Sequence, residues 1–116
     1  GNATHSGAST LQNGYAVEFR CGGFEEIVTR FHGGARTNLH NAEVSELNTG
    51  ARPLKVVFTK MVDRVRMQIY YDGSLIATVD DTDANRKTGA CYVGLGSYAP
   101  STNYVYFDGF EVTVTF

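Results

Sequence analysis

The chain has 116 residues, of which 42% are hydrophobic and 19% are charged, and its net charge is −2. This length suffices for one small domain with a real core but not for two. The near balance of 10 basic and 12 acidic residues lacks the electrostatic pattern of proteins that bind nucleic acid or anionic membranes. No apolar run approaches the roughly 20 residues that a membrane-spanning helix needs.

Residues 1–12 are predicted to be a polar N-terminal tail, and residues 13–116 a single domain. The chain starts at Gly1, as expected of a processed chain, an excised domain or a tag remnant. An N-glycosylation sequon begins at Asn2 and favours a secreted protein.

The first two strands are predicted over residues 15–21 and 24–32, where apolar and polar side chains alternate. A period of two is the pattern of a strand that buries one face. The predicted inner face of the second strand is Ile27, Thr29 and Phe31. The Gly- and Asn-rich segment 33–41 is predicted to be a loop, and residues 42–47 a short strand.

The clearest strand pattern follows, over residues 54–61 and 65–71. The predicted inner face of the second of these strands is Val65, Met67, Ile69 and Tyr71. Asp72-Gly73 suits a type I′ turn, because both central positions of that turn need a positive φ. Residues 74–79 then return, so the sequence predicts a three-stranded meander.

The last third contains a polar loop over residues 80–89 and two further strands, over 90–98 and 103–116. Cys21 and Cys91 both lie at inward positions, which fits either a disulfide or two separate buried thiols. About eight short strands at this spacing indicate an antiparallel β-sandwich.

Four segments in this order resemble the later part of concanavalin A-like (laminin G-like) jelly-roll domains. They are NGYAVEF, LKVVFTKMVDRVRMQIYYDGSLIATVDD, TGACYVGLGSY and YVYFDGFEVTV, and they fall within residues 13–116. The resemblance implies an all-β jelly-roll sandwich that binds glycans or glycoproteins. Such domains usually have opening strands before the first segment. This chain is therefore a minimal version, or its opening strands lie on another polypeptide or were lost by processing. Open sheet edges favour pairing with a second polypeptide or a homodimer.

The same resemblance implies a structural calcium ion with Asp108 as a ligand. A second acidic segment contains Asp80, Asp81, Asp83 and Asn85, for which ordinary turn chemistry is the alternative.

No carboxylate pair has the arrangement that glycoside hydrolysis requires. The acidic residues at close spacing are Glu25 and Glu26, Glu43 and Glu46, and Asp81 and Asp83. All are predicted to be solvated, and we expect no enzymatic activity. His32 and His40 flank the Gly-rich segment and could meet in space, as surface residues or as a weak ligand contact.

Sugar binding needs an aromatic surface for the apolar side of the sugar and planar polar groups for its hydroxyls. Outward positions of the predicted strands supply both, at Arg64, Arg66, Gln68, Tyr70, Tyr92, Tyr104 and Tyr106. A second candidate region is the loop 32–41, with His32, Arg36 and Asn38. The alternative is that the tyrosines serve strand pairing or cover a domain interface.

We therefore expect a non-catalytic, lectin-like carbohydrate-binding module of a secreted, extracellular protein. One alternative is a structural or protein-interaction sandwich that packs on a partner chain. Another is the non-catalytic part of a glycoside hydrolase.

Overall fold

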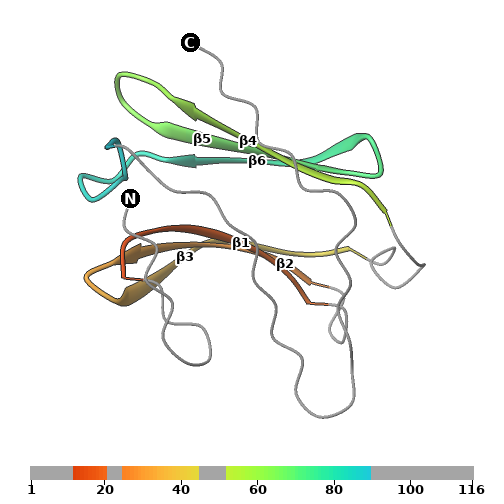
Figure 1. Ribbon diagram of the computed structural model, residues 1–116, viewed down its shortest axis with the longest axis horizontal. Coiled ribbons are helices and arrows are strands. Elements are labelled where there is room, and N and C mark those ends of the chain that lie inside the picture. Colours follow the sequence, from red (N-terminus) through yellow and green to blue (C-terminus); the bar gives the residue numbers. More distant parts are fainter. Residues whose placement is uncertain (1–11, 21–24, 45–51, 90–116) are drawn as a thin grey trace.

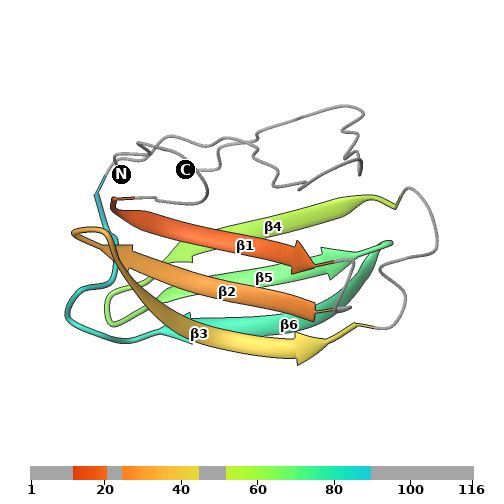
Figure 2. The same cartoon turned by 90° about the horizontal axis from the view of Figure 1, so that it is seen from below.

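The computed structural model describes residues 12–20, 25–44 and 52–89, which form two three-stranded antiparallel sheets. The first sheet has the spatial order β1 (Gly14–Arg20), β2 (Glu25–His32) and β3 (Ala35–Glu43). The second has the order β4 (Leu54–Lys60), β5 (Val65–Tyr71) and β6 (Ser74–Asp81). Figures 1 and 2 show the sheets face to face as two layers. Over these ranges, no helix has the length and apolarity needed to cross a membrane.

Each sheet is a meander, because consecutive strands pair with one another and the middle strand is central. In the second sheet, Met67 of β5 lies between Phe58 of β4 and Val79 of β6. The predicted meander of residues 54–79 is thereby confirmed. Its strands correspond to β4, β5 and β6 within one or two residues at each end.

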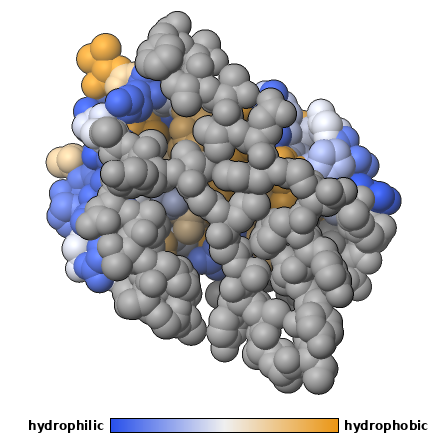
Figure 3. Space-filling view, viewed as in Figure 1, coloured by the Kyte–Doolittle hydropathy of each residue, from blue (hydrophilic) through white to orange (hydrophobic). Residues whose placement is uncertain are grey.

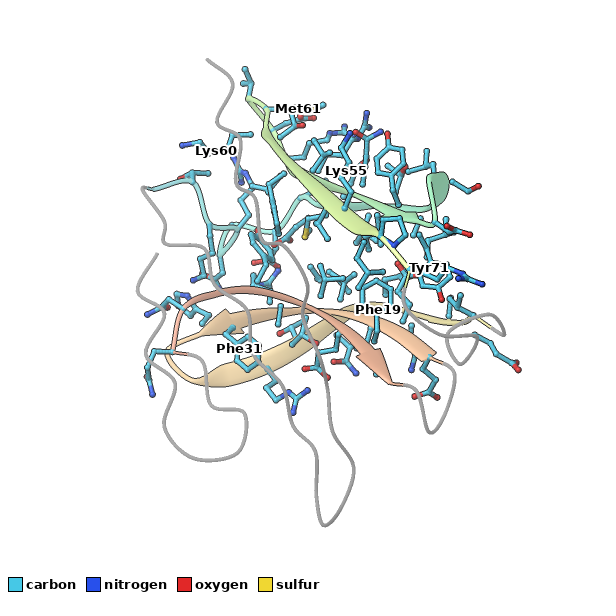
Figure 4. The ribbon with its side chains drawn as sticks, turned by 45° about the vertical axis from the view of Figure 1, so that its right-hand side comes forward. Phe19, Phe31, Lys55, Lys60, Met61 and Tyr71 are labelled. Carbon is cyan, nitrogen blue, oxygen red and sulfur yellow. The ribbon has the colours of Figure 1, made fainter. Side chains whose placement is uncertain are left out.

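The core lies between the two sheets. Val28 of β2 packs there with Met67 and Ile69 of β5 and Val79 of β6, and all four are at most 6% exposed. The burial of β5 alternates as predicted, with Val65, Met67, Ile69 and Tyr71 buried. In Figure 4, Phe19 and Tyr71 point towards one another from opposite sheets, with ring centroids 6.4 Å apart. Figure 3 shows hydrophobic residues near the centre of this view and at its upper left, and mostly hydrophilic residues along both sides.

The predicted inner face of the second strand is wrong. Val28 and Arg30 point towards the second sheet, where Arg30 pairs with Asp81 of β6. The predicted set, Ile27, Thr29 and Phe31, lies on the outer side of the first sheet and is also buried. A strand buried on both faces loses the polar alternation that reveals which face is inner, and the sequence pattern cannot assign its phase.

The predicted loop over residues 33–41 is also wrong. Only Gly33 and Gly34 form the turn, with φ of 57° and 85°, and β3 begins at Ala35. Two glycines are sufficient for a two-residue type I′ turn, because glycine adopts positive φ without steric cost. The residues that follow are polar because the first half of β3, which lies at one edge of the described sheet, is exposed.

Several predictions fall outside the described residues. These are the N-terminal tail, the strands over 90–98 and 103–116, and the end of the strand over 42–47. The pairing of Cys21 with Cys91 also lies there.

The type I′ turn between β5 and β6 makes Gly73 a sensitive position. Asp72 and Gly73 have φ of 52° and 85°, as predicted. We expect Gly73→Val to lower the free energy of unfolding by about 1–2 kcal/mol, because a β-branched residue is strained at positive φ. Gly89→Val is the matched control, since no atom lies within 4 Å of an added Cβ there and its φ is not positive. Equal effects of the two changes in urea unfolding would contradict this account of the turn.

Candidate functional site

The structure brings the largest group of predicted ligand residues together on the outer face of the second sheet. Alternation on β5 turns Arg66, Gln68 and Tyr70 away from the core, each half-buried. Cross-strand pairing places a residue of β4 and one of β6 beside each of them. The β4 neighbours are Thr59, Val57 and Lys55, and the β6 neighbours are Asp80, Thr78 and Leu75.

Asp80 organises the arginines of this face. Its carboxylate accepts hydrogen bonds from Arg66 Nε at 2.8 Å and from Arg64 Nη1 at 3.0 Å. Arg64 also donates to Asp63 Oδ2 at 3.0 Å. The hydrogen bond from Arg66, aided by that from Arg64, lowers the pKa of Asp80 to about 2. The carboxylate is therefore ionised throughout the physiological range and holds both guanidinium groups in fixed orientations.

Tyr70 forms the aromatic part of the same face. The Lys55 ammonium lies 5.1 Å from the centre of the Tyr70 ring, in cation–π geometry. Figure 4 shows Lys55 on the side of β4 that faces away from the first sheet. An aromatic ring, an amide, two threonine hydroxyls and an ion-pair network thus lie side by side over three strands.

The residues of the second candidate region do not join this face. Arg36 and Asn38 lie on the outer side of the first sheet, where Arg36 is 5.6 Å from the Phe31 ring centre and Thr29 Oγ1 donates to Asn38 Oδ1. His32 lies at the end of β2, with Nδ1 2.6 Å from Lys87 Nζ. Outside the described residues lie Tyr92, Tyr104, Tyr106, Asp108, Cys21 and Cys91.

A buried polar network that the sequence reasoning missed joins the two sheets. Asp81, predicted to be solvated, is only 2% exposed. Its carboxylate accepts hydrogen bonds from Arg30 Nη1 and from Tyr15 Oη, both at 2.8 Å. Burial acts to raise the pKa of Asp81, but these two hydrogen bonds, a backbone hydrogen bond from Asp83 and the charge of Arg30 together lower it. Burial also raises the pKa of Tyr15 to about 12. One signal was available, since Asp81 continues the inward phase of Val79.

The same network anchors residues 82–89. Tyr15 Oη accepts a hydrogen bond from the Lys87 backbone at 3.0 Å, and Asp81 Oδ1 accepts one from the Asp83 backbone at 3.2 Å. The carboxylates of Asp80 and Asp81 thus accept hydrogen bonds from protein donors. Residues 12–20, 25–44 and 52–89 contain no group of three or more His, Cys, Asp or Glu residues able to hold a metal ion.

Glu26 is the second buried group that was expected to be solvated. It is 1% exposed and lies 3.5 Å from His40, measured from Oε2 to Nε2. Burial raises the pKa of Glu26. His32 and His40 do not meet, because His40 pairs across from Val28 while His32 pairs with Ala35 at the far end of β2.

Comparisons with known proteins give no match to this chain among protein-family models, curated proteins or solved structures. The assignment of a function therefore depends on the geometry and chemistry of the residues described above.

Proposed function

We propose that the protein is a non-catalytic carbohydrate-binding module and that the outer face of the second sheet is its ligand surface. One observation carries the proposal. Arg66, Gln68 and Tyr70 lie in a single row on β5, beside hydroxyl, ammonium and carboxylate groups from both neighbouring strands. Glycans are recognised by this combination of a ring surface and planar hydrogen-bonding groups.

The ion-pair network suits such a surface because it orders polar groups before a ligand arrives. Asp80 is bound through two nitrogens of Arg66, at 2.8 and 3.0 Å. Side chains that are already held in place lose less conformational entropy on binding. Three neighbouring strands about 4.8 Å apart give a flat surface about 10 Å wide, which matches one or two sugar rings.

The ionisation state of Asp80 favours a role in glycan binding over a role in glycoside hydrolysis. Glycoside hydrolysis needs a carboxyl group that can donate a proton near neutral pH. The two arginines hold the pKa of Asp80 at about 2, so it cannot serve as that acid.

The proposal includes a jelly-roll topology, an extracellular location and a glycan or glycoprotein partner. Two facing antiparallel sheets are compatible with a jelly roll, and the order of the four sequence segments supports it. The sequon at Asn2 supports secretion. A structural calcium ion at Asp108 stays a prediction from the resemblance.

A glycan array followed by titration calorimetry tests the ligand surface. The wild-type protein is expected to bind at least one class of glycan. Gln68→Ala and Tyr70→Ala are each expected to weaken that binding about tenfold, the loss typical of one well-placed contact. Asn38→Ala, on the outer side of the other sheet, is the control and leaves affinity unchanged. Absence of glycan binding, or equal binding by all four proteins, would contradict the proposal.

A protein-interaction role is the second candidate, and a different observation favours it. Five large apolar residues are exposed on the second sheet and its turns, at 37% or more of their surface. They are Leu54, Phe58, Met61, Val62 and Leu75. Such residues gathered along β4 and the following turn suit a partner protein or a second copy. A stable complex in light scattering, without any glycan signal, would favour this role.

A further inference from the structure

Glu26 and His40 occupy a place in the molecule where a charge is costly. Glu26 points from the central strand β2 into the space between the sheets, and its cross-strand neighbours are Phe19 on β1 and Ala42 on β3. It is 1% exposed, and neither carboxylate oxygen has a hydrogen-bond partner among the described residues. A buried ionised carboxylate without such partners strongly destabilises the folded state.

We propose that Glu26 and His40 form a proton-dependent contact in the core, which stabilises the packing of the two sheets in mild acid and weakens it as the pH rises. His40 Nε2 lies 3.5 Å from Glu26 Oε2 and is itself buried, with no hydrogen bond to any residue that the structure describes. One proton shared between these two groups removes the isolated negative charge. Loss of that proton leaves the negative charge of Glu26 uncompensated.

The other described groups around Glu26 do not compensate its charge. The second sheet contributes Tyr71, whose ring lies beside that of Phe19, and Ile76, which packs in the same apolar cluster. Arg30 lies four residues further along the same face of β2, where its guanidinium is bound to Asp81. Of the described charged groups, His40 is the one whose field acts on Glu26.

His40 also connects the contact to solvent. Its side chain is 28% exposed although Nε2 is turned inwards. The imidazole can therefore exchange protons with water while the carboxylate stays buried.

The direction of the effect follows from proton linkage. Burial raises the pKa of Glu26 above its ordinary value of 4.5, and protonated His40 opposes that rise. A raised pKa means that the folded state binds more protons than the unfolded state. The stabilisation is complete below 4.5 and is lost as the pH rises through the folded value. Asp80 and Asp81 have lowered pKa values, so their contributions to stability are lost as the pH falls into the acid range.

The test compares thermal unfolding midpoints of the wild type and Glu26→Gln between pH 4.5 and 8.5. An amide has nearly the shape of the carboxyl group and does not ionise. The unfolding midpoint of the variant relative to that of the wild type is expected to rise by about 5 °C from pH 4.5 to pH 8.5. Asp72→Asn is the matched control, because Asp72 is exposed and asparagine suits its turn; its midpoint difference from the wild type stays constant with pH.

A second measurement keeps the proposal testable if Glu26→Gln does not fold. The ¹³C resonance of the Glu26 carboxyl group in the wild-type protein is expected to titrate with a pKa above the ordinary value of 4.5. Titration of Glu26 at or below its ordinary value would overturn the proposal. So would a midpoint difference between Glu26→Gln and wild type that does not change with pH.

Discussion

Asp81→Asn is expected to lower the free energy of unfolding by about 3–5 kcal/mol, the range for breaking one side of a buried ion pair. The Arg30 side chain is 8% exposed, and its Nη1 lies 2.8 Å from Asp81 Oδ1. The amide cannot balance the guanidinium charge, which then stays in the core. Asp83 lies 3.8 Å from Arg30 Nη2 and compensates only in part, so a value in the lower half of the range is expected.

Urea unfolding at pH 7 measures this loss, with Asp80→Asn as the control. Asp80 also pairs with arginine, but its ion pairs are exposed and screened by solvent, so its replacement is expected to have a far smaller effect. Adding Arg30→Met to Asp81→Asn removes the uncompensated charge and is expected to recover part of the loss. Equal losses at Asp80 and Asp81 would show that the Arg30 pair is not shielded from water.

The difference in the free energy of unfolding between the wild type and Asp81→Asn depends on pH. The lowered pKa of Asp81 means that its stabilisation is present at neutral pH and is lost as the pH falls through its folded value. The difference between the wild type and Asp81→Asn is therefore expected to shrink in acid.

Ile69→Ala is expected to lower the free energy of unfolding by about 2–5 kcal/mol, as for other large-to-small changes in cores. Ile69 is 0% exposed on the central strand of its sheet and packs in the cluster that includes Val28 of the opposite sheet. The change removes apolar contacts from both layers and leaves a cavity between them. Val62→Ala is the control, because Val62 is 98% exposed.

Urea unfolding of these two variants tests whether the sheets pack face to face. Val62→Ala is expected to stay within about 0.5 kcal/mol of the wild type. A similar small loss for Ile69→Ala would mean that β5 does not form the centre of a packed interface.

The second sheet could be predicted almost completely. The alternation of Val65, Met67, Ile69 and Tyr71 lies on a strand with one buried face and one half-exposed face, so period and phase are both visible. The turn at Asp72-Gly73 depends on the conformations of two adjacent residues. The outward positions of Arg66, Gln68 and Tyr70 follow from the same alternation.

The first sheet was predicted less well, for two reasons. β2 is buried on both faces, so no polar alternation marks its inner side. β3 is an edge strand whose polar first half resembles a loop, and only the two glycines before it mark the true turn. The burial of Glu26 and Asp81 also escaped prediction, because isolated acidic residues in a sequence are usually solvated.

By itself, the sequence determined the all-β character, the position of most described strands and the outward positions of Arg66, Gln68 and Tyr70 on β5. Periodicity and turn chemistry depend on residues only a few positions apart, so the chain displays them directly. Only the tertiary structure decided which face of β2 is inner and which charges are buried. Asp81 meets its partners Arg30 and Tyr15 across 51 and 66 positions of the chain, a pairing that exists only when the two sheets lie against one another.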